Sequence, residues 1–72
     1  MKESLMLTPE DIKQGVKSHL EGHVNKHKIN VMNLLHNPAG IGEHGDIVEE
    51  IEKELEEMAN YHDKLEMLAK YF

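Results

Sequence analysis

The fold is decided by a short stretch, NPAGIGE at residues 37–43, which separates two long runs of amphipathic sequence. Asn37 precedes Pro38, and a residue before proline avoids the helical region of backbone space, so a preceding helix should end there. Gly40 and Gly42 then interrupt regular structure. Because the connection is short, the helices on either side of it should be antiparallel neighbours.

The run before this stretch has the pattern of one long helix, over about residues 9–36. Thr8 is a good N-cap, Pro9 fits the first helical position, and Glu10 and Asp11 lie at the positive end of the helix dipole. Apolar residues recur along one side at helical spacing. They are Ile12, Val16, Leu20, Val24, Val31, Leu34 and Leu35.

The run after the stretch predicts a second helix, over about residues 44–71. Its apolar positions alternate steps of three and four residues, which is a heptad pattern. This predicted seam consists of Val48, Ile51, Leu55, Met58, His62, Leu65, Ala69 and Phe72. The chain is thus expected to be a single all-α domain over residues 1–72, folded as an antiparallel two-helix hairpin.

Two helices with apolar faces this wide cannot cover each other completely. Each is about 40 Å long, and a hairpin offers only one line of contact. A 72-residue chain also buries only about 60% of the surface of its unfolded form. We therefore expect a homodimer that forms a four-helix bundle. Its predicted interface residues are Leu20, Val24, Val31, Ile51, Leu55, Met58 and Leu65.

Composition argues against several classes of function. The net charge is −6 and all eight basic residues are lysines, so direct binding of nucleic acid is not expected. No apolar run approaches the roughly 20 residues that cross a bilayer, and the first residues do not resemble a signal peptide. No membrane association and a cytoplasmic location are therefore expected. The chain has no cysteine, which excludes disulfides and thiolate metal sites.

Histidine is unusually frequent, with six in the chain. His19, His23 and His27 recur every four residues on one helix face. His62 should lie level with His19 in the hairpin, so one hypothesis is a zinc or nickel site formed by His19, His23 and His62. The alternative is that these imidazoles flank or enter the apolar seam, with His27 and His62 neutral and hydrogen-bonded. His36 and His44 flank the connection and can cap helix ends.

An enzyme is not expected. Ser4 and Ser18 have no acid–base partner at a recognisable spacing. The Gly40–Gly42 segment lacks the length, the lysine and the preceding strand of a phosphate-binding loop. No catalytic residue and no cofactor are therefore predicted.

The stretch NPAGIGEH at residues 37–44, followed by Asp46, Ile47 and an acidic helix ending in Lys70-Tyr71-Phe72, resembles small proteins encoded by marine tailed phages, cyanophages among them. The resemblance implies an origin in a phage and the cytoplasm of an infected bacterium. It implies no activity and no functional residues.

Three functions are compatible with the sequence. The favoured one is a self-associating helical module or adaptor that binds another, unidentified protein. The second is a helical bundle that binds metal through its histidines. The third is a structural or assembly component of a virion.

Overall fold

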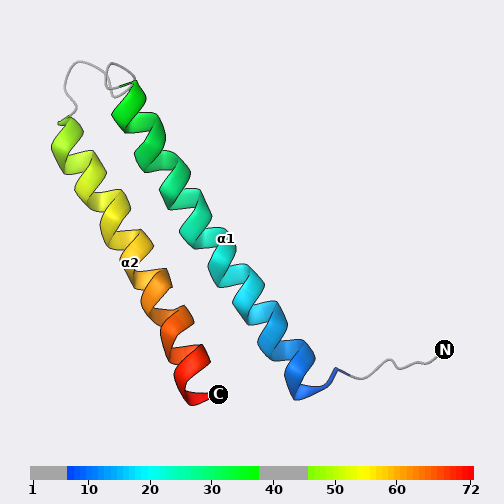
Figure 1. The fold of residues 1–72 in the computed structure, drawn as a ribbon. Helices are drawn as coiled ribbons and strands as arrows, with labels where there is room; N and C mark the ends of the chain where they lie inside the picture. The colour runs from blue at the N-terminus through cyan, green and yellow to red at the C-terminus, as the bar shows by residue number, and fades with distance from the viewer. Residues whose placement is uncertain (1–6, 38–45) are drawn as a thin grey trace.

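The computed structural model describes residues 7–37 and 46–72 of the protein. These residues form two α-helices and no strand: α1 spans Pro9–His36 and α2 spans Ile47–Tyr71. The helices lie side by side and run in opposite directions, so that the end of α1 and the start of α2 lie at the same end of the molecule (Figure 1). The predicted all-α two-helix hairpin is confirmed for the described residues.

The start of α1 is fixed by a reciprocal pair of hydrogen bonds. The Asp11 backbone N–H donates to the Thr8 hydroxyl at 3.0 Å, and the Thr8 backbone N–H donates to the Asp11 carboxylate at 3.1 Å. This capping box lowers the pKa of Asp11, mainly through the hydrogen bond from the Thr8 backbone. The helix ends at His36, where the Asn37 N–H donates to the Asn33 carbonyl at 2.8 Å. Both predicted ends of this helix are confirmed.

The start of α2 is fixed by a cap at Asp46. This residue has extended backbone angles, and one of its carboxylate oxygens accepts hydrogen bonds from the N–H groups of Val48 and Glu49, at 3.0 and 3.1 Å. Asp46 is therefore the N-cap and the helix begins at Ile47, within three residues of the predicted start at about residue 44. The predicted end at Tyr71 is confirmed. The connection beyond Asn37 and the cap suggested for His44 lie outside the described residues.

One stripe of α2, which we call the inner stripe, faces α1. It alternates steps of four and three residues, as a helix in a coiled-coil contact does. Every member is half-buried: Ile47, Ile51, Glu54, Met58, Tyr61, Leu65 and Leu68.

A second stripe, which we call the outer stripe, has the same spacing and lies one residue further along the sequence. All its members are exposed: Val48, Glu52, Leu55, Ala59, His62, Glu66 and Ala69. The predicted seam mixed the two stripes, so its assignment of Leu55 and His62 to a buried line is wrong for the hairpin. The inner stripe carries more large apolar residues than the outer stripe, and its one acid, Glu54, bonds to α1.

The hairpin has a very small core. Leu20 is the one apolar side chain that is buried within residues 7–37 and 46–72, at 7% exposure. Full burial of a leucine stabilises a fold by about 1.5–3 kcal/mol, whereas domains are typically stable by about 5–15 kcal/mol. The remaining contacts between the described helices are made by half-buried residues.

Candidate interaction surface and the histidine cluster

A polar layer crosses the contact between the helices. His27 is buried, at 9% exposure, and its Nδ1 lies 2.7 Å from the Glu54 carboxylate. A carboxylate can only accept, so this ring nitrogen carries the proton and donates. Asn30 Nδ2 donates to the same oxygen at 2.9 Å. These bonds, first the one from His27, lower the pKa of Glu54. The sequence-based expectation that His27 is hydrogen-bonded within the seam agrees with this geometry.

An aromatic stack continues from this layer. The Tyr61 ring lies almost parallel to the His23 ring, with centroids 4.2 Å apart, and to the His27 ring, with centroids 5.8 Å apart. The His19 ring meets His23 edge-on at 4.6 Å. Loss of water around the ring lowers the pKa of His23, and the surrounding positive charges lower it further. Those charges belong to His19, Lys26, His27 and Lys64.

Sequence analysis missed the two α2 residues that complete the cluster, Glu54 and Tyr61. Both belong to the inner stripe, whose steps of four and three residues are as regular as those of the predicted seam. This second heptad pattern is the sequence signal that could have identified them. Glu54 is one of many acids in its helix and therefore resembles a solvent-facing residue. Its selection depends on His27 and Asn30, which are 27 and 24 residues away in the chain.

The three histidines predicted to bind metal are not brought together. His19 and His23 are adjacent, but His62 is exposed and its place beside His23 is taken by Tyr61. Across residues 7–37 and 46–72, no group of three or more histidine, aspartate or glutamate side chains is arranged to hold a metal ion. The geometry therefore gives a zinc or nickel site at His19, His23 and His62 no support.

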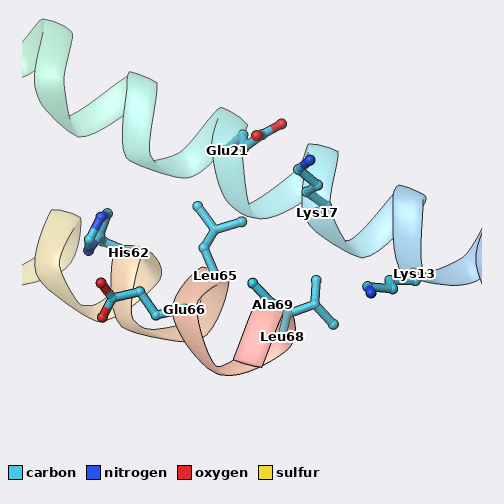
Figure 2. Close-up of a pocket in the computed structure, with 8 residues that line it drawn as sticks. All are labelled: Lys13, Lys17, Glu21, His62, Leu65, Glu66, Leu68 and Ala69. Carbon is cyan, nitrogen blue, oxygen red and sulfur yellow. The ribbon is translucent and has the colours of Figure 1, made fainter. Parts of the chain in front are cut away.

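A groove of about 440 Å³ lies between the helices, toward the N-terminal end of α1. Figure 2 shows leucine and alanine side chains of α2 on its floor, with Lys13 and Lys17 of α1 toward one end and His62 and Glu66 toward the other. Its lining residues are Lys13, Lys17, Glu21, His62, Leu65, Glu66, Leu68 and Ala69. The groove is therefore apolar at its base and carries opposite charges at its two ends.

Many large apolar side chains remain exposed. Neither helix contains a segment that is long and apolar enough to cross a membrane. Isolated exposed apolar residues are normal, whereas a contiguous exposed patch marks an interaction surface. The exposed large apolar side chains are Leu7, Ile12, Val16, Ile29, Met32, Leu35, Val48, Leu55, Met67, Tyr71 and Phe72.

The residues predicted for a dimer interface divide into two groups. Leu20 is buried within one hairpin, and Val24, Val31, Ile51, Met58 and Leu65 are half-buried there. Leu55 alone is exposed, at 49%. Of the predicted set, Leu55 therefore offers the most surface to a second chain.

Comparison with known proteins yields no relative. The chain matches no family model, no curated protein and no solved structure. The surfaces of the hairpin itself are therefore the source of functional information.

Proposed function

We propose that the protein is a self-associating helical interaction module, in which two hairpins pack into a four-helix bundle that binds a further protein. The observation that carries the proposal is the imbalance within one chain. A single apolar side chain is buried, while eleven large ones are exposed, among the described residues. A second hairpin is the simplest partner that supplies the missing half of the core.

The biological setting is a proposal that depends on the resemblance of residues 37–44 to small phage proteins. We place the module in the cytoplasm of an infected bacterium, where it acts as an adaptor. The net charge of −6 without arginine supports a protein partner rather than nucleic acid.

Thermal unfolding at several protein concentrations tests self-association. If the bundle is the folded form, the melting temperature rises with concentration, because dimerisation stabilises the fold by mass action. Circular dichroism at 222 nm from about 5 to 500 μM, a range that brackets ordinary micromolar dimers, provides the measurement. A melting temperature that stays constant over this range would exclude self-association as the source of stability.

A further inference from the structure

The outer stripe of α2 carries both an exposed apolar side chain and one wall of the groove. Leu55 is half-exposed, and His62, one heptad later, lines the groove. Residues seven apart lie on nearly the same side of a helix, so Leu55 and the groove face the same direction. One surface of the hairpin thus presents an apolar projection and an apolar depression side by side.

We propose that the groove of each hairpin receives Leu55 of a second copy, so that the two α2 helices pack antiparallel about a two-fold axis near Ala59 and His62. This inference rests on the proposed self-association and specifies its geometry. Under a two-fold axis, Leu55 of the first copy enters the groove of the second, and Leu55 of the second enters the groove of the first.

The spacing along α2 fits this arrangement. The α2 residues of the groove centre on Glu66, eleven residues from Leu55, or about 16 Å along the helix axis. An axis midway between them passes close to Ala59 and His62. Ala59 is small and exposed, so two helices can approach closely at this point.

Charge complementarity selects the antiparallel orientation. Neither Lys13 nor Lys17 has a carboxylate within ion-pair distance among residues 7–37 and 46–72. Glu52 lies one turn before Leu55 on the outer stripe and is exposed. With Leu55 in the groove of the second copy, Glu52 lies toward the lysine end of that groove, and the neutral Ala59 lies toward the end with His62.

A parallel arrangement would lose these matches. Each Leu55 would then meet the other Leu55 rather than a groove, and the lysines of the two copies would face each other. The repulsion between these lysines would disfavour the parallel arrangement. The charge pattern therefore determines the orientation of the two copies more than the affinity between them.

Charge reversal tests this geometry directly. Lys17→Glu and Glu52→Lys are each expected to raise the dimer dissociation constant about tenfold, because each change replaces two attractive contacts per dimer with repulsive ones. The double variant should return to within about threefold of the wild type. Within one hairpin these residues lie about 20 Å apart along the helices, so a restored affinity reports a contact between chains.

Sedimentation equilibrium of the wild type, both single variants and the double variant gives these constants, with circular dichroism to verify equal helix content. Lys26→Glu is the matched control, since Lys26 is exposed nine residues from Lys17, on the opposite side of α1. A double variant weaker than either single variant overturns the proposed geometry while leaving self-association intact. A wild type that remains a folded monomer overturns self-association itself.

Discussion

The inner and outer stripes of α2 have the same heptad spacing but differ in burial: the inner stripe is half-buried against α1, and the outer stripe is exposed. The inner stripe has five large apolar side chains besides Tyr61 and a single acid, and it packs against α1. The outer stripe has only two large apolar side chains, Val48 and Leu55, with two acids, and it is exposed. Apolar content therefore agrees with the face that α2 buries. The polar members of that face are accommodated because α1 offers Glu54 two hydrogen-bond donors and offers Tyr61 two imidazole rings.

The largest expected effect comes from removing the apolar side chain at the centre of the outer stripe. Leu55→Ala would cost little in a lone hairpin, where Leu55 is 49% exposed. If Leu55 is buried in a dimer, the cost is about 2–5 kcal/mol per site, and it is incurred twice. Chemical denaturation at fixed protein concentration measures the change.

Ile29→Ala is the matched control for this variant. Ile29 is exposed to a similar degree, at 56%, but lies nine residues from Leu20, on the side of α1 away from α2. We expect Ile29→Ala to change the free energy of unfolding by no more than about 0.5 kcal/mol. If the two variants lose the same free energy of unfolding, Leu55 is no more buried in the assembled protein than Ile29, which contradicts a dimer contact at the outer stripe.

The polar member of the inner stripe should matter next most. Glu54→Ala leaves the buried His27 donor without its acceptor, which should cost about 1–3 kcal/mol. Glu56→Ala removes an exposed acid from the same helix and should be nearly neutral. Urea unfolding of the two variants compares them, and equal stabilities would contradict a selective role for Glu54.

Replacing both partners sharpens the test of the polar layer. The double variant His27→Leu, Glu54→Leu removes the buried donor together with its acceptor and leaves only the half-buried Asn30 amide without this bond, so it should be more stable than either single replacement. If the double variant is instead the least stable of the three, the His27–Glu54 pair adds to the free energy of unfolding beyond avoiding an unpaired buried group, which contradicts the expectation.

Acid should weaken the inner stripe through His23. The pKa of His23 is lowered from its ordinary 6.5, so near that pH the unfolded chain binds a proton that the folded chain does not. Stability that is present above pH 6.5 is therefore lost as the pH falls through 6.5 toward the folded pKa. Glu54, with its lowered pKa, adds a further loss as the pH falls below 4.5.

Thermal melts at pH 7.5 and 5.5 measure this effect. The wild type should melt at a lower temperature at pH 5.5, and His23→Gln should reduce the difference between the two pH values. A larger difference in the variant would mean that protonation of His23 stabilises the fold, contrary to its surroundings.

The smallest effect is expected on the side of α1 that faces neither stripe. A Cβ added at Gly15 or Gly22 would meet no atom within 4 Å. Gly22→Ala should therefore stabilise the helix by up to about 1 kcal/mol, because alanine loses less backbone entropy. A shift in the urea midpoint measures the gain, and a destabilised Gly22→Ala variant would indicate that this side is also covered in the assembled protein.

Local signals made the helices predictable from sequence. Thr8-Pro9 and Asn37-Pro38 act through neighbouring residues, so both ends of α1 followed from the sequence alone. The start of α2 was predicted to within three residues, although Asp46 was not singled out as its cap. Each of these features depends on a few consecutive residues.

The choice of stripe could not be predicted in the same way. The two heptads of α2 differ by one residue, and the adjacent Ile51, Met58 and Leu65 suit either contact. The larger number of large apolar residues in the inner heptad was the signal available in the sequence, whereas the partners of Glu54 and Tyr61 in α1 lie far away in the chain. The metal site stays a hypothesis without support from the geometry of the described residues, because the direction of His62 around the helix could not be predicted from the sequence.

Sedimentation equilibrium of the untagged wild-type protein at micromolar concentration tests most directly whether the outer stripe needs a second copy. We predict a folded species of twice the chain mass of 8.3 kDa, which dissociates and loses helix together on dilution. A fully helical species of 8.3 kDa at all concentrations would show that one hairpin is stable alone, and would contradict the account.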